Sequence, residues 1–343
     1  MADGPATDTD LWPVSAVLGK RTMLAWSGKF SLPTASDMKT PFTLAHFSDI
    51  HLSPIAGFGL RHWNAKRTLG FLNWQRGRKR VHEREIADRL LMDAIALRAD
   101  HIAITGDLIN LGLPSEYEAA RSWLDALGSP EDVTVVPGNH DVYTRLAGHI
   151  GVARWAAYMG CEEGSLAFPF VRRIGPLALI GLNSAIETPP FVASGRLGAH
   201  QIEVAGEMLE RLADEDVIRV VLIHHPPLPG LASARRALAD AAQFARVLER
   251  AGAELVLYGH NHRERLNWHV DAATRTGSAP IPVIGVPSAS AARAHKDEPL
   301  ARYNIFTFFP GEDGLRIRYT IRGLETPNGE IVKLAESILE MPT

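Results

Sequence analysis

Short apolar runs alternate with amphipathic segments along the chain from about residue 42. The apolar runs predict strands, most of them buried on both faces, at Phe42–Phe47, His101–Thr105, Val133–Val136, Leu177–Leu182, Ile218–Ile223 and Glu254–Tyr258. The segments between them have apolar residues at helical spacing and predict helices at Glu83–Arg98, Glu116–Leu127, Ala199–Leu212 and Ala234–Arg250. This alternation predicts an α/β fold. After residue 280, the runs Tyr303–Phe309 and Leu315–Ile321 predict a second, more antiparallel layer of strands.

Composition is consistent with a large globular core. The chain has 343 residues, of which 46% are hydrophobic, and this excludes collagen, a coiled coil and general disorder. With 36 basic and 39 acidic residues, the formal charge is −3, so we do not expect nucleic acid as a partner. The one cysteine, Cys161, excludes an internal disulfide and a thiolate metal cage. A reducing, cytoplasmic setting is the expectation.

Polar residues of metal-ligand type follow directly after five of the predicted strands. Ligands bind at the carboxyl ends of strands in open α/β sheets. Asp49 and His51 follow the first strand, and on an extended chain residues two apart point the same way and can share one ion. Asp107 follows the second strand, after a glycine that lets the backbone turn. Taken singly, these residues are explained equally well as a turn, a helix cap and a loop histidine.

The other endings repeat the pattern. They contribute Asn139, His140 and Asp141, then His224 and His225 before Pro226, and finally His260 and His262. A single histidine at a strand end is more often held by a hydrogen bond than by a metal, but five polar endings in one chain favour a metal site. The remaining histidines are expected to be structural or surface residues: His46, His62, His82, His101, His149, His200, His269 and His295.

In this order the motifs resemble those of the calcineurin-like metallophosphoesterase superfamily. They are Asp49-x-His51, Gly106-Asp107, Gly138-Asn139-His140-Asp141, His224-x-Pro226 and Gly259-His260-Asn261-His262. The resemblance covers about residues 42 to 290. It implies a four-layer α-β-β-α sandwich of two mixed sheets flanked by helices, and an enzyme in which a hydroxide that bridges two metal ions attacks phosphorus.

The resemblance also implies roles for the individual residues. One ion would take Asp49, His51, Asp107 and His262, and the other Asp107, Asn139, His224 and His260, with Asp107 bridging. His140, outside the ligand set, would stabilise the developing charge or protonate the leaving oxygen. Asp141 would orient His140 or, alternatively, cap a helix.

The donor set constrains the metals. Two divalent cations outweigh two carboxylates and a hydroxide by one positive charge, which suits an anionic phosphate. Imidazole and carboxylate ligands without thiolate fit Mn, Fe, Zn or Co. Such ions acidify the bridging water and polarise the phosphoryl oxygens.

The sequence also limits the class of phosphoester that is expected as substrate. The residues after Asp107 are Leu-Ile-Asn, and the residue after His140 is Asp141. This pattern disfavours a Ser/Thr protein phosphatase. The His-His-Pro-Pro and Gly-His-Asn-His motifs, with Pro287-Ser288, are similar to those of bacterial cyclic-nucleotide and glycerophosphodiester phosphodiesterases. We therefore expect a small-molecule phosphodiester as substrate.

Residues 55–82 form a basic and aromatic insertion between the first two motifs. Seven Lys or Arg residues and no acid lie between Arg61 and Arg80, interleaved with aromatic residues. The insertion could be a lid in which Arg67 and Trp74 contact substrate, with Asn110 and His225 as further binding candidates. It could instead contact anionic lipid headgroups, favouring a lipid-linked phosphodiester or pyrophosphate substrate. A third interpretation is a solvated insertion without a binding role.

These interpretations define the expected organisation. Residues 1–40 lack the features of a secretory signal and are expected to form a loosely ordered arm, 41–325 the catalytic domain and 326–343 a C-terminal tail. The location is expected to be cytoplasmic, with peripheral contact at the inner face of the membrane as an alternative. A non-catalytic metal-binding scaffold and a DNA nuclease are the other functional alternatives. The sequence does not indicate an oligomeric state.

Overall fold

The structure is a computed structural model of the chain. It describes residues 40–55, 58–59, 65–76, 81–143, 151–161, 166–270, 280–311 and 314–340. Apart from Thr40, the arm expected over residues 1–40 lies outside the described residues.

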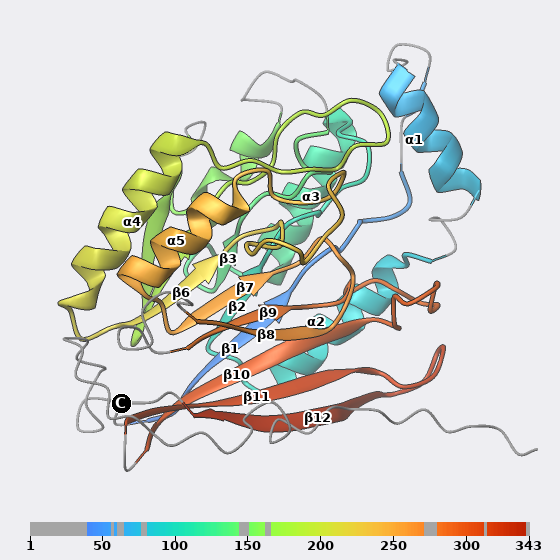
Figure 1. The fold of residues 1–343 in the computed structure, drawn as a ribbon. Coiled ribbons are helices and arrows are strands. Elements are labelled where there is room, and N and C mark those ends of the chain that lie inside the picture. The colour runs from blue at the N-terminus through green and yellow to red at the C-terminus, as the bar shows by residue number, and fades with distance from the viewer. Residues whose placement is uncertain are drawn as a thin grey trace, which may run out of the picture.

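Two six-stranded mixed sheets form the centre of the molecule (Figure 1). The first sheet contains, in spatial order, β12 (Ile331–Glu340), β11 (Gly314–Leu324), β10 (Arg302–Gly311), β1 (Phe42–Phe47), β2 (His101–Ile104) and β3 (Val133–Val135). The second contains β4 (Phe170–Ile174), β5 (Leu177–Gly181), β6 (Ile218–Leu222), β7 (Leu255–Tyr258), β9 (Ile281–Gly285) and β8 (Arg265–His269). β1, β2 and β3 run parallel, as do β5, β6, β7 and β9.

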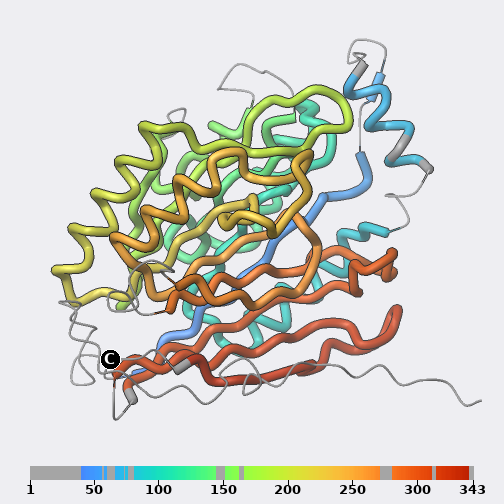
Figure 2. The backbone as a smooth tube through the Cα atoms, in the orientation of Figure 1, coloured from blue at the N-terminus to red at the C-terminus, as the bar shows by residue number. Residues whose placement is uncertain are grey.

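Helices cover the outer faces of both sheets (Figure 2). α2 (Arg84–Ala96), α3 (Pro114–Leu127) and the 3₁₀ helix η5 (Val152–Met159) pack on the first sheet, and α4 (Ala199–Ala213) and α5 (Ala241–Ala251) pack on the second. The remaining helix, α1 (Ala65–Arg76), lies apart from the sheet faces (Figure 1). In β6, Val220 packs in the core shared with the first sheet, whereas Val221 packs with Leu209 of α4 and Leu248 of α5. This alternation follows from the two-residue period of a strand. It confirms the predicted four-layer sandwich.

Three details differ from the sequence-based prediction. The C-terminal strands do not form a separate layer, because β10 pairs directly with β1 and extends the first sheet. Residues 326–343 are not simply a tail, because they contain β12, which pairs antiparallel with β11. β12 is an edge strand with mostly half-exposed side chains, so its apolar pattern is weak. α5 begins at Ala241 rather than at residue 234, because the preceding backbone pairs with Gly195.

Candidate metal centre

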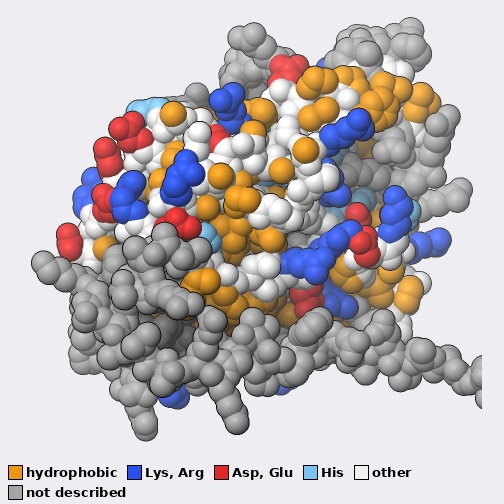
Figure 3. Space-filling view, in the orientation of Figure 1, with side chains coloured by type: hydrophobic (Ala, Val, Ile, Leu, Met, Phe, Trp, Pro, Cys, Tyr) orange, Lys and Arg blue, Asp and Glu red, His pale blue; other side chains and the backbone are white. Residues whose placement is uncertain are grey.

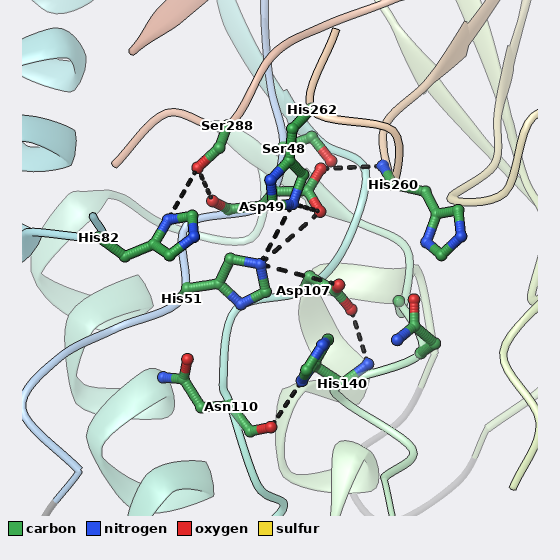
Figure 4. A network of polar contacts seen from close by, with 12 residues as sticks. Ser48, Asp49, His51, His82, Asp107, Asn110, His140, His260, His262 and Ser288 are labelled. Carbon is green, nitrogen blue, oxygen red and sulfur yellow. Dashed lines mark hydrogen bonds and ion pairs between the residues drawn. The ribbon is translucent and has the colours of Figure 1, made fainter. Parts of the chain in front are cut away.

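The strand ends of the two sheets bring two clusters of buried ligand-type side chains together. Asp49, His51 and His262 form the first, and Asp107, His224 and His260 the second. Within each cluster the ligand atoms lie within 4.8 Å of one another. Figure 4 shows Asp49, His51 and His262 of the first cluster close together, with Asp107 of the second cluster beside His51.

The first cluster has the spacing expected of ligands around one ion. His262 Nε2 lies 3.0 Å from Asp49 Oδ1, and His51 Nε2 lies 3.5 Å from His262 Nε2 and 3.8 Å from Asp49 Oδ1. Atoms that each bind a metal at about 2.1 Å are separated by roughly 3 to 4 Å in tetrahedral or octahedral geometry. The three side chains therefore fit a single divalent ion.

The second cluster has the same spacing and includes Asn139. His224 Nε2 lies 3.5 Å from Asp107 Oδ2, 3.1 Å from Asn139 Oδ1 and 3.2 Å from His260 Nδ1. Asp107 Oδ2 is also 4.0 Å from His51 Nε2 of the first cluster. Asp107 thus lies between the clusters, where a bridging carboxylate would be.

Hydrogen bonds on the far side of the rings orient three of the histidines. The Nδ1 atoms of His51 and His224 lie 3.3 and 2.6 Å from the carbonyl oxygens of Ile109 and Thr105, and both carbonyls can only accept. His262 Nδ1 lies 3.1 Å from Glu298 Oε2. Each of these contacts leaves Nε2 facing the cluster, as metal-binding histidines require.

The buried carboxylates of the two clusters stabilise positive charge on the neighbouring histidines. Burial by itself disfavours a charged imidazole, but Asp107 raises the pKa of His224 to about 9, and Asp49 raises that of His262 to about 9. In return His224, more than any other neighbour, holds the pKa of Asp107 well below its usual range despite burial. The electrostatics of the site therefore favour cations at these positions.

The ligands are held on an unusual backbone. Asp49, His51, Asp107, His260 and His262 have φ angles of 54°, 48°, 57°, 67° and 53°. This left-handed region costs about 1 kcal/mol or more per non-glycine residue. Asp49 and His51 therefore reach the same cluster through tight turns and not, as their spacing suggested, along an extended strand.

Two glycines allow the ligand loops to approach each other closely. A Cβ at Gly138 would lie 2.2 Å from Asp107 Oδ1. A Cβ at Gly259 would lie 1.8 Å from Ser48 Oγ and 2.7 Å from Asp49 Oδ2. Any side chain at these positions would displace a carboxylate of the site.

The side-chain hydrogen bonds of Asp141 in the described residues go to backbone N–H groups, and its predicted role in orienting the imidazole of His140 stays a prediction. Its buried carboxylate accepts the backbone N–H groups of Gly138 and Asp107 at 2.8 Å, of Leu108 at 2.9 Å and of Ile109 at 3.2 Å. Burial and the Asp107 carboxylate raise the pKa of Asp141 to about 7, while the backbone donors oppose this rise. Asp141 therefore joins the loop after β2 to the loop after β3.

His140 lies beside the clusters and belongs to neither. Its Nδ1 is 2.6 Å from the main-chain oxygen of Asn110, and its backbone N–H donates to Asp107 Oδ1 at 2.7 Å. Its ring centre is 5.0 Å from that of His51. The side chain is partly exposed, so a ligand can reach it.

The four predicted substrate-binding residues have structural contacts. Asn110 Nδ2 donates to Leu52 O at 2.9 Å, and His225 Nδ1 lies 2.8 Å from Ser184 Oγ. Arg67 donates to the main-chain oxygens of Leu111 and Gly112, and Trp74 is buried and stacks on Phe71. Contact of these four residues with substrate stays a prediction.

Several residues near the site were not identified from the sequence. The ring of His82, assigned there to a structural or surface role, lies 4.7 Å from His51 and 5.5 Å from His262, and its Nδ1 lies 2.9 Å from Ser290 Oγ. Ser288 donates to the main-chain oxygen of Asp49 at 2.7 Å. The Pro287-Ser288 motif entered the sequence analysis only as a similarity to bacterial phosphodiesterases, and no sequence pattern indicated Glu298, which contacts His262.

The two clusters lie at the strand ends of the sandwich, and their carboxylate and imidazole groups are suited to holding two divalent metal ions. Residues 42–264 match the model of the calcineurin-like phosphoesterase family, and the chain belongs to this family. It is therefore a metallophosphoesterase, as its motifs indicated. None of the helices in the described ranges has the length and apolar character needed to cross a bilayer.

Curated relatives include two bacterial phosphodiesterases. The chain is 25% identical to a glycerophosphodiester phosphodiesterase of Enterobacter lignolyticus, over 69% of this chain and 77% of the relative. It is 28% identical to a 3',5'-cyclic-nucleotide phosphodiesterase of Nostoc sp., over 66% of this chain and 73% of the relative. A dimetal phosphatase from Danio rerio has the same fold, with a TM-score of 0.54, 16% identity and coverage of 86% of this chain and 99% of that one.

Proposed function

We propose that the protein hydrolyses a small phosphodiester, of the cyclic-nucleotide or glycerophosphodiester type, with two divalent metal ions. The observation that carries this proposal is the position of Asp107 between two buried ligand clusters, with His140 beside them. The names of the two bacterial relatives support a diester over a monoester. The substrate is a small molecule, because the near-neutral charge of the chain does not favour nucleic acid.

In this reaction seven residues would bind the metal ions and His140 would transfer a proton. Asp49, His51, Asp107 and His262 would hold one ion, and Asp107, Asn139, His224 and His260 the other. When bound, the ions supply Lewis acidity for the phosphoryl group and an acidified water as nucleophile. Because His140 Nδ1 lies at the Asn110 carbonyl, Nε2 is the nitrogen of His140 that would protonate the leaving oxygen.

The donor set of imidazole, carboxylate and amide oxygen fits Mn, Fe, Zn or Co. No thiolate contributes to the metal centre, since the thiol of Cys161 donates hydrogen bonds to the carbonyl oxygens of Met159 and Ala167. We place the protein in the cytoplasm, where this cysteine would stay reduced.

The proposed function is tested by the hydrolysis of bis(p-nitrophenyl) phosphate and p-nitrophenyl phosphate by metal-stripped protein after Mn, Fe, Zn or Co is added back. We expect metal-dependent hydrolysis that favours the diester and is abolished in Asn139→Ala. The matched control is Gln243→Ala, which removes an exposed amide on α5. If two metals bind but neither ester turns over, a metal-binding scaffold replaces the proposal. If no metal binds, the dinuclear centre itself is refuted.

A second candidate substrate is a lipid-linked phosphodiester or pyrophosphate at the inner face of the membrane. Leu69 and Leu72 of α1 are each 41% exposed, and Phe191 is 81% exposed. Figure 3 shows hydrophobic side chains gathered around α1, within the insertion whose sequence is strongly basic. Sedimentation with vesicles of anionic or zwitterionic lipid tests this candidate. Binding to anionic vesicles that is weakened in Leu69→Ser and Phe191→Ser would support it, and no binding would exclude it.

A further inference from the structure

The first turn of α1 connects loops from both sheets. Arg67 donates from Nε to Leu111 O at 3.2 Å and from Nη2 to Gly112 O at 2.6 Å, on the loop that follows β2 and carries Asp107. The neighbouring Lys66 donates from Nζ to Thr188 Oγ1 at 3.3 Å, on the loop that follows β5. The first turn of α1 therefore joins the loop after β2, which carries Asp107, to the loop after β5.

The same turn packs against Tyr143, which stacks on His140. The Tyr143 hydroxyl donates to the main-chain oxygen of Lys66 at 3.2 Å, and the Lys66 ammonium lies 4.5 Å from the centre of the Tyr143 ring. The rings of Tyr143 and His140 are 5.4 Å apart and inclined by only 17°. A Cβ at Gly70 would lie 2.4 Å from the Tyr143 hydroxyl oxygen, so α1 is in close contact with this ring. One aromatic ring thus separates the Lys66 ammonium from His140.

The charge of Lys66 is not neutralised by the described residues. Within the described ranges, no carboxylate lies within the 4.0 Å ion-pair distance of its ammonium, which contacts only a hydroxyl group and an aromatic face. The side chain is partly buried, and burial lowers its pKa, whereas the more distant Glu187 opposes this shift. A partly desolvated cation of this kind is stabilised when an anion binds to it.

We propose that Lys66 binds an anionic group, a carboxylate or a second phosphate, on the leaving group of the ester, and so selects substrates that carry one. The proposal rests on the proposed function. If His140 protonates the leaving oxygen, the leaving group lies against His140, and the Lys66 ammonium lies against the Tyr143 ring that stacks on His140. Lys66 is then a specificity-determining residue, and it is one of the seven basic residues of the insertion for which a substrate-contacting lid was one of the three interpretations.

The test uses two chromogenic diesters that differ only in the leaving group: methyl 4-nitrophenyl phosphate, and methyl 3-carboxy-4-nitrophenyl phosphate, whose leaving phenol carries a carboxylate. We expect the native enzyme to prefer the carboxylated ester. Lys66→Met should lower kcat/KM for that ester about tenfold and leave the other within about twofold. Lys66→Arg should restore most of the preference, because it restores the charge. The matched control is Lys333→Met on β12, which removes an exposed lysine.

Two results would overturn the proposal. An equal loss of kcat/KM for both esters in Lys66→Met would show that Lys66 only supports Tyr143 and His140, and unchanged values for both would show that it has no role. If the native, metal-loaded protein turns over neither ester, the proposed function fails, and calorimetric titration with the same esters then decides the role of Lys66. Tighter binding of the carboxylated ester that is lost in Lys66→Met would support the proposal, and equal binding of the two esters would refute it.

Discussion

His140 Nδ1 lies 2.6 Å from the main-chain oxygen of Asn110. Since a carbonyl oxygen only accepts, this contact places a hydrogen on Nδ1 and leaves Nε2 as the nitrogen that can exchange a proton. The acceptor is a main-chain oxygen, so the contact does not depend on the identity of the side chain at position 110. It ties the orientation of the proposed acid to the loop that carries Asp107.

Replacing this acid should affect substrates according to their leaving groups. We expect His140→Gln to lower kcat about a hundredfold or more for a dialkyl phosphodiester, whose leaving alcohol needs a proton, and less for a p-nitrophenyl ester. Steady-state kinetics on both esters, with metal content measured by mass spectrometry, check this. Equal losses for the two esters, or a loss of bound metal, would argue against a role in protonation.

The position of Asp107 between the clusters predicts a specific pattern of metal loss. Asp107→Asn should weaken both metal sites, whereas His262→Ala should weaken only the first, because His262 contacts Asp49 and His51 but not the second cluster. We therefore expect His262→Ala to retain about one equivalent of metal and Asp107→Asn less. Equilibrium dialysis followed by elemental analysis measures this. Equal retention by the two variants would exclude a bridging carboxylate.

The metal-stripped protein should lose stability in alkaline solution. The folded-state pKa values of His224 and His262, each about 9, lie above the ordinary histidine pKa of 6.5. Their contribution to the free energy of unfolding is therefore fully present below pH 6.5 and is lost as the pH rises through 9. Urea unfolding of the stripped protein at several pH values measures this decline.

Metal-loaded protein is the control for this experiment, because metal-bound histidines do not take up protons. It should be more stable than the stripped protein and should not show the same decline between pH 6.5 and 9. A stripped protein whose stability is constant over this range would contradict the predicted protonation of the two histidines.

Asp141 should matter for stability more than for proton transfer. In Asp141→Asn one carboxylate oxygen becomes an NH₂ group, which would face backbone N–H donors that need an acceptor. We expect the free energy of unfolding to fall by about 2 kcal/mol or more. The pH dependence of kcat should keep its shape, because the Asn110 carbonyl orients His140. A shifted pH profile at unchanged stability would support the role first predicted for Asp141.

The strands and the loops of the metal centre were predictable because both depend on local patterns, whereas the four-layer sandwich was predicted from the resemblance of the motifs to those of a known family. Buried strands appear as apolar runs, and the ligands follow these runs directly, as at Asp49 and Asp107. β12 was missed because an edge strand with half-exposed side chains has no clear pattern. The start of α5 was misplaced because the pairing of Gly195 with Ala237 and Ala239 is a tertiary contact.

Other features of the site were not predictable for a similar reason. Glu298 contacts His262 across 36 residues, and the rings of His82 and His51 meet through the packing of separate loops. The left-handed backbone at the ligands is also not encoded in their residue types, since aspartate and histidine adopt it only when the surrounding structure compensates for the strain. These features depend on the assembled fold.

Within the described residues, α1 contributes no side chain to either ligand cluster, although it contacts the loop after β2 that carries Asp107. The metal ligands lie at the ends of strands that are fixed by the two sheets, whereas α1 belongs to an insertion between two of these strands. Substitutions in α1 can therefore change which ester fits without changing the metals or their ligands. Relatives could diverge in substrate while retaining the same metal chemistry.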